Sequence, residues 1–453
     1  MKESMEEDFE LLDYNEAVHI ERTNLLSTNE TKMEYDPNHW VGRRRQTWTF
    51  LLFFGCLLVY ATRSSVGICV VDMSKELGWD KQVSGFVMST FFFGYIITQI
   101  AGGILADRYG GDRMLFYSAF VWSICTFLIP VIGGVFHMPY TMSIIVLRAL
   151  SGVAQGIHFP ALASLLSRRV HPSHRNSVFA IAASGSAFGN VLNGVAGSLL
   201  LEFYGWRSVF YLLGGLSVLW VMVLRLANTK ENVINRKISS ISSSSAGKQG
   251  KTSWRIFVQS KAFWALAFTT GTESFVFTSL MSWSPTYFSE HFPDGKGWLF
   301  NVVPWVASFI FQNAAGLFSD HALQKGWSTT KLRKLFVTLA GAVAGLICFR
   351  FATGVTTFES ALLHMTLMIG CLGTNSVGLA MNPQDLAPEQ AGSLFGFMNT
   401  IAALTGMIGV YFVGHILEAT KAWSNVYFTI SLVSFLGTFV FALFGSGKKI
   451  ENK

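Results

Sequence analysis

Two arginines lie inside stretches of sequence that are otherwise suited to lipid. Arg63 falls in the apolar segment 48–70 and Arg148 in the apolar segment 141–165. A guanidinium within a membrane is costly, so it normally faces the protein interior and binds a partner there. Neither segment contains an acidic residue that could neutralise its arginine. Because the planar guanidinium donates two parallel hydrogen bonds to carboxylate or phosphate, the pair predicts an organic-anion site.

Both arginines are expected at the same depth. Antiparallel helices through the two segments place each roughly 10 Å from the non-cytoplasmic surface. On the second helix Gln155 shares a face with Arg148, and His158 lies one turn further on. Tyr95, in segment 85–106, offers a ring for stacking. We therefore expect substrate binding by Arg63, Arg148, Tyr95, Gln155 and His158, although an arginine could instead snorkel or bind a carbonyl, and His158 could simply pack.

One carboxylate, Glu273, stands at mid-depth in segment 261–288. It could be a proton site, a counter-ion for an arginine, or a structural partner of neutral polar groups, and the sequence leaves these alternatives open. His158 is a second candidate for proton coupling because histidine titrates near neutral pH.

The composition indicates how these side chains are positioned. Of 453 residues, 51% are hydrophobic and only 13% are charged. Soluble proteins carry about a quarter charged residues, so this chain is expected to cross the membrane many times in a lipid bilayer. The net charge of +7 then reflects cytoplasmic loops and requires no nucleic acid. The five cysteines have no metal-ligand spacing, and we expect no metal, no cofactor and no enzymatic activity.

Twelve apolar stretches are long enough to span a bilayer, since a spanning helix needs roughly 20 residues. They lie near 48–70, 85–106, 114–135, 141–165, 177–200, 208–228, 261–288, 298–318, 333–352, 359–381, 391–415 and 424–445. Lys and Arg gather in the loops on one side, which places both termini in the cytoplasm.

The predicted organisation has five parts. They are an acidic, disordered cytoplasmic tail over 1–46, a six-helix half over 47–228, a Ser-rich cytoplasmic linker over 229–260, a second six-helix half over 261–446, and a short cytoplasmic tail over 447–453.

The two halves share a repeated motif. "GGILADRYGGDR" follows the second stretch and "GLFSDHALQKGW" follows the eighth, which aligns Gly103 and Asp107 with Gly316 and Asp320. A duplicated pair of six-helix units is typical of transporters that rock around a central substrate site.

This loop resembles the signature of the major facilitator superfamily. The resemblance implies an all-α membrane fold of twelve transmembrane helices in two halves, operating by alternating access. It also implies a gating latch at the cytoplasmic helix ends, formed by Gly103, Asp107 and Arg108, with Arg113 in support and Asp320 as the repeat counterpart.

Within the superfamily, "YATRSSVGICVVDMS", "LRALSGVAQGIHFPA" and "LEFYGWRSVFYLLGG" resemble the vesicular organic-anion branch. Sialin and the glutamate transporters of that branch carry a proton-linked glutamate where this chain has Gln155, and the glutamate transporters an arginine where it has Glu273. The resemblance therefore favours potential-driven, chloride-modulated transport of anionic nucleotides such as ATP, ADP and GTP out of the cytosol. A proton-coupled carrier of sialic acid or glutamate type is the alternative, and an anion channel is less favoured.

The acidic tail contains two patterns that resemble dileucine sorting signals. "EDFELL" places Glu7 before Leu11 and Leu12, and "ERTNLL" places Glu21 before Leu25 and Leu26. They imply adaptor proteins as partners and delivery to secretory vesicles, synaptic-like vesicles or lysosomes. We expect a monomer.

Overall fold

The computed structural model describes residues 39–79, 81–131, 139–241, 254–292 and 297–450, and these residues form helices without a strand. Each predicted span corresponds to one helix or to one interrupted helical rod. In the first half these are α2 (Gly42–Leu77), α3 (Lys81–Tyr109), α4 (Gly111–Leu128), α5 (Tyr140–Arg169), α6 (Pro172–Leu192), which continues through η2 (Asn193–Gly197) and α7 (Ser198–Tyr204), and α8 (Trp206–Ile241).

The second half begins with the short α9 (Trp254–Gln259). The long elements that follow are α10 (Lys261–His291), α11 (Gly297–Gln324), α12 (Thr329–Ala352), α13 (Phe358–Gly373), which continues through α14 (Asn375–Gly378), α15 (Asn382–Leu386) and η3 (Pro388–Gln390), then α16 (Ala391–Thr420) and α17 (Trp423–Phe444). Among the described residues, ten helices are long and apolar enough to cross a membrane. The predicted spans that correspond to α4 and α10 fall outside these ten, since α4 begins with charged residues and α10 is rich in Ser and Thr. The chain is a multi-pass membrane protein.

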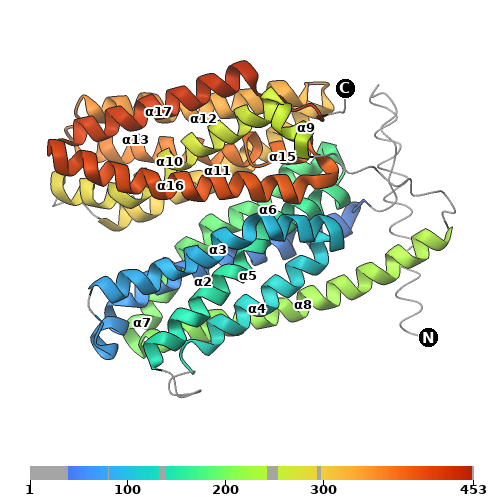
Figure 1. The fold of residues 1–453 in the computed structure, drawn as a ribbon, viewed down its shortest axis with the longest axis horizontal. Coiled ribbons are helices and arrows are strands. Elements are labelled where there is room, and N and C mark those ends of the chain that lie inside the picture. Colours follow the sequence, from blue (N-terminus) through green and yellow to red (C-terminus); the bar gives the residue numbers. More distant parts are fainter. Residues whose placement is uncertain (1–38, 80, 132–138, 242–253, 293–296, 451–453) are drawn as a thin grey trace.

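The same pairs of helices pack in each half. α2 contacts α6, α3 contacts α5 and α4 contacts α8, while the corresponding contacts in the second half join α10 to α16, α11 to α13 and α12 to α17. Figure 1 shows the halves as two layers, blue to green and yellow to red. Between the layers, α3 and α5 contact α16, and α6 contacts α11.

Small residues bring α3 and α5 close together. A Cβ atom added at Gly152 of α5 would lie 2.0 Å from the carbonyl oxygen of Phe91 on α3. Only glycine allows this approach, which places the α3 backbone directly beside the α5 turn that carries Arg148.

Helices α2 and α8 run into segments that were predicted to be cytoplasmic tail and linker. α2 begins within the expected cytoplasmic tail, and α8 continues beyond 228 into the expected linker. Glu231 anchors the first part of the α8 extension, because its buried carboxylate accepts hydrogen bonds from Trp40 Nε1 (3.0 Å), Arg44 Nε (2.9 Å) and Trp48 Nε1 (3.3 Å). Hydrogen bonds to a charged group are comparatively strong, so Glu231 holds the end of α8 against the start of α2.

Candidate functional site

The two predicted arginines lie against the same aromatic ring. The Cζ atoms of Arg63 on α2 and Arg148 on α5 are each 5.0 Å from the ring centroid of Phe91 on α3. Arg148 is buried, with 4% of its surface exposed, and Arg63 is half-buried. The structure therefore brings together the two cations that the sequence placed at one depth.

The groups around Arg63 are neutral. Its guanidinium carbon lies 4.7 Å from the ring centroid of Tyr60 and 4.6 Å from that of Tyr95, and its Nε donates a long hydrogen bond (3.4 Å) to Gln155 Oε1. Gln155 in turn donates to Thr62 Oγ1 at 3.2 Å. Cation–π contacts hold a guanidinium without neutralising it.

Both guanidiniums keep donors for a ligand. Nη2 of Arg63 and Nε of Arg148 are buried without a hydrogen-bond partner. Within the described part of the chain, no ion pair includes either arginine. Buried donors without partners are unfavourable unless a ligand satisfies them. An anion that binds two arginines at once fits this arrangement.

Tyr95 connects this site to the second half. Its hydroxyl accepts a hydrogen bond from Asn399 Nδ2 of α16 at 3.0 Å, and the same amide donates to Gln99 Oε1 at 2.8 Å. Phe91, Tyr60 and Asn399 were not among the predicted site residues. The sequence could have indicated Phe91, because it precedes Tyr95 by one helical turn and therefore lies on the same face of the helix.

Among the described residues, no hydrogen bond or ring contact joins His158 or Glu273 to the arginine pair. His158 is buried in the first half, with Nε2 3.9 Å from Cys56 Sγ and its ring 6.4 Å from that of Trp220. Glu273 of α10 is buried in the second half, where Oε2 accepts from Asn375 Nδ2 at 3.2 Å and Oε1 has no partner. The structure thus pairs Glu273 with an amide. The roles of both residues in binding or coupling stay predictions.

The cytoplasmic ends of the halves are joined by Asp107. Its carboxylate accepts hydrogen bonds from Gly392 N (3.1 Å), Ser393 N (2.7 Å) and Ser393 Oγ (2.5 Å) in the first turn of α16. A carboxylate is favourable there because the first N–H groups of a helix lack partners and carry partial positive charge. A Cβ atom at Gly103 would lie 2.2 Å from the Gly392 carbonyl oxygen, so this position also needs glycine.

The repeat counterpart also reaches across the interface. Asp320 of α11 accepts from Ser177 N and Asn176 Nδ2 of α6, both at 2.9 Å. Asn176 Oδ1 accepts from Arg333 Nη1 at 2.8 Å, and Arg333 forms an ion pair with Asp385 (2.6 Å). We call the Asp107 and Asp320 contacts the two cytoplasmic latches, and the gating role predicted for Gly103, Asp107 and Asp320 stays a prediction.

Arg108 and Arg113 have other surroundings. The Arg108 guanidinium lies over the ring of Tyr109, 5.3 Å from its centroid, and Arg113 is exposed. A different arginine, Arg168 of α5, donates to the Asp107 carbonyl oxygen. The latch roles of Arg108 and Arg113 stay predictions.

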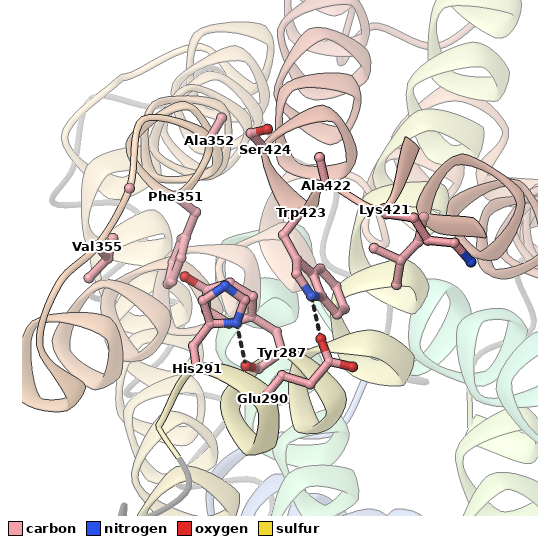
Figure 2. Close-up of a pocket in the computed structure, with 12 residues that line it drawn as sticks. Tyr287, Glu290, His291, Phe351, Ala352, Val355, Lys421, Ala422, Trp423 and Ser424 are labelled. Carbon is pink, nitrogen blue, oxygen red and sulfur yellow. Dashed lines mark hydrogen bonds between the residues drawn. The ribbon is translucent and has the colours of Figure 1, made fainter. Parts of the chain in front are cut away.

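A separate cavity opens at the non-cytoplasmic end of the second half. It has a volume of about 750 Å³ and is lined by the end of α10, the α12–α13 connection and the α16–α17 connection. Figure 2 shows Trp423 pointing to Glu290, with its Nε1 donating at 2.7 Å, and His291 bonded to the Tyr287 carbonyl. Neither Arg63 nor Arg148 lines this cavity.

A matching contact holds the same face of the first half. Trp206 Nε1 of α8 donates to Glu76 Oε2 of α2 at 2.8 Å, and Arg207 pairs with the same carboxylate at 2.6 Å. We call the Glu76–Trp206 and Glu290–Trp423 contacts the two clasps. The predicted sorting residues, Glu7 to Leu26, lie outside the described residues.

Comparison with known proteins agrees with this arrangement. Residues 52–410 match the Major Facilitator Superfamily model, and the chain belongs to this family. The fold resembles the proton:xylose symporter XylE, with a TM-score of 0.70, 13% identity and coverage of 90% of this chain and 97% of that one.

Relatives within the family are more similar in sequence. The human voltage-gated purine nucleotide uniporter SLC17A9 is 38% identical over 91% of this chain and 94% of its own length. The chloroplastic sodium-dependent phosphate transport protein 1 of Arabidopsis thaliana is 32% identical over 91% of this chain and 80% of its own length. These matches confirm the resemblance that the motifs indicated.

Proposed function

We propose that the protein is a uniporter that moves anionic purine nucleotides from the cytosol into an organelle, driven by the membrane potential. The observation that carries this proposal is the Arg63–Arg148 pair, which shares the Phe91 ring and retains unpartnered N–H donors. The names of the human, rat and mouse relatives, each a voltage-gated purine nucleotide uniporter, support it.

Physical chemistry favours voltage as the driving force. Gln155, the residue beside Arg63, cannot carry a proton at any physiological pH. Each charge gains about 2.3 kcal/mol per 100 mV, so a polyanion accumulates strongly in a compartment held positive inside. Aromatic rings beside the arginines offer surfaces on which a purine base can stack.

Uptake of labelled ATP into liposomes tests the proposal, with an inside-positive potential and no pH gradient. Arg63→Gln and Arg148→Gln each remove charged hydrogen bonds worth about 1.5–3 kcal/mol, and we expect each to lower uptake at least tenfold. The matched control is Arg350→Gln, because Arg350 is exposed at the end of α12 and should not affect uptake. Parental uptake by both site variants would refute the proposal.

A proton-coupled organic-anion carrier is the second candidate. The unpartnered Oε1 of buried Glu273 favours it, because a carboxyl in that position could bind a proton. A pH gradient at zero potential separates the two functions. It would drive sialic acid or glutamate through a symporter and leave a nucleotide uniporter inactive.

Location, partners and modulation complete the proposal. We infer delivery to secretory vesicles or lysosomes through adaptor proteins that bind the two dileucine-like signals, and stimulation by chloride. Replacing Leu11, Leu12, Leu25 and Leu26 by Ala should move a tagged protein to the cell surface, as observed by microscopy. Omitting chloride should slow ATP uptake into the liposomes.

A further inference from the structure

One face of α3 forms a continuous contact with α16. Tyr95, Gln99, Gly103 and Asp107 are spaced four residues apart and therefore lie in one row along the helix. The row begins at the ring beneath Arg63 and ends at the first cytoplasmic latch.

The opposing residues of α16 contact this row closely. A Cβ atom at Gly396 would lie 2.2 Å from the Gln99 carbonyl oxygen, and one at Gly103 would lie 2.2 Å from that of Gly392. Backbones this close cannot slide or separate gradually, so a displacement at one end of the row is transmitted to the other.

Asn399 is the polar link at the end of the row nearest the arginines. Its amide donates to both Tyr95 Oη (3.0 Å) and Gln99 Oε1 (2.8 Å). Gln99 is fully buried, and its Nε2 has no hydrogen-bond partner while the cytoplasmic face is closed. Separation of α3 and α16 would allow this N–H donor to find a hydrogen-bond partner, and this gain favours the separated arrangement.

We propose that Asn399 is a positioning residue that transmits anion binding at Arg63 to the Asp107 latch. An anion that reaches Arg63 while the cytoplasmic face is closed enters from the opposite side, because a uniporter works in both directions. By drawing the Arg63 guanidinium from the Tyr95 ring it also displaces the hydroxyl that Asn399 holds, and the α3–α16 contact then opens from that end. This inference rests on the proposed function, because it needs an anion at Arg63.

A thiol at the latch reports the opening. Ser164 of α5 is fully buried, its Cβ lies 3.0 Å from a Cβ built at Gly392, and its hydroxyl has no partner, so Ser164→Cys preserves the closed structure. The five native cysteines are buried, and protein without the new thiol measures their background. Maleimide labelling of purified full-length Ser164→Cys protein is measured with and without ATP, together with ATP affinity and uptake.

In the Ser164→Cys parent we expect ATP to accelerate labelling several-fold. With Asn399→Leu added, we expect ATP affinity within about threefold of the parent, no acceleration by ATP, and uptake lowered about tenfold. Asn313→Leu is the matched control, because within the described residues Asn313 bonds only to the Phe309 carbonyl of its own helix and should retain the full response.

The outcomes are distinguishable. If ATP still accelerates labelling in Asn399→Leu, even from a raised baseline, the side chain is only structural and the inference is wrong. If the parent itself neither binds nor responds to ATP, the proposed function fails and this inference fails with it.

Discussion

The two faces of the molecule are held together in different ways. At the cytoplasmic face, Asp107 and Asp320 accept hydrogen bonds from helices of the opposite half. At the other face, Glu76 and Glu290 each accept one from a tryptophan of their own half. All four carboxylates follow the duplication, yet the latches join the halves and the clasps hold each half together.

This difference distinguishes contacts that must break during the transport cycle from contacts that can stay intact. Alternating access requires the halves to part at one face and then at the other. The latches lie across the dividing surface, so they exist only while the cytoplasmic face is closed. Because the clasps lie within the halves, they can persist through the whole cycle. Changes at the latches should therefore alter conformation, and changes at the clasps should alter stability alone.

The largest effect is expected at Gly103, where the two halves approach each other closely. Gly103→Ala adds a Cβ that would lie 2.2 Å from the Gly392 carbonyl oxygen. Overpacking of this kind costs about 1–3 kcal/mol, so the cytoplasmic face should open and labelling of Ser164→Cys should rise about tenfold, with loss of ATP uptake. Gly67→Ala is the control, because a Cβ there has nothing within 4 Å. Equal labelling of Gly103→Ala and Gly67→Ala would show that contacts between the halves do not control the conformation.

A smaller conformational effect is expected from the latch carboxylates. Asn at position 107 or 320 keeps one acceptor oxygen but loses the charge, which weakens the hydrogen bonds by about 1 kcal/mol. Asp107→Asn and Asp320→Asn should each raise labelling of Ser164→Cys several-fold and leave the thermal midpoint nearly unchanged. A fall in midpoint without a rise in labelling would place the latches among the structural contacts.

A stability effect without a conformational one is expected at the clasps. Trp423→Phe leaves Glu290 without its indole donor and should lower the thermal midpoint by about 2–4 °C. Trp206→Phe should have a smaller effect, since Glu76 retains Arg207. Labelling of Ser164→Cys should be unchanged in both, and any increase would show that a clasp senses the conformation.

The smallest effect concerns pH. The Arg207 guanidinium, aided by the Trp206 indole, holds the pKa of Glu76 below its ordinary value. A lowered pKa means that the stabilisation is present at neutral pH and is lost only as the pH falls through that lowered value. Glu76→Gln should therefore lower the thermal midpoint by about 1 °C at both pH 7 and pH 5, because the pair is exposed. If the Glu76→Gln variant and the parent had equal thermal midpoints at pH 5, this prediction would be wrong.

The sequence predicted the parts of the site that depend on depth and repetition. Unneutralised charge in an apolar helix indicated Arg63 and Arg148, and the repeated loop indicated Asp107 and Asp320. It did not predict Asn399 or Arg333, because their partners lie on helices far away in the chain. An intramembrane asparagine has the same local signature whether it links two halves or bonds to its own helix, as Asn313 does.

The limits of α8 escaped prediction for a similar reason. The polar composition after residue 228 is typical of a linker, yet the helix continues to Ile241. The first part of this extension is held by Trp40, Trp48 and Arg44, which bind Glu231 and lie more than 180 residues earlier in the chain. Local composition carries no information about such a distant partner.

The neutral surroundings of the arginine pair have an electrical consequence. Aromatic rings and an amide leave both positive charges uncompensated, so the vacant site bears a net positive charge. A bound polyanion of more than two charges reverses that sign. In the cycle proposed above, the field that draws the loaded site toward a positive compartment also drives the vacant site back toward the cytosol, at about 2.3 kcal/mol per charge and 100 mV. One membrane potential would then drive both the movement of the loaded site and the return of the vacant site.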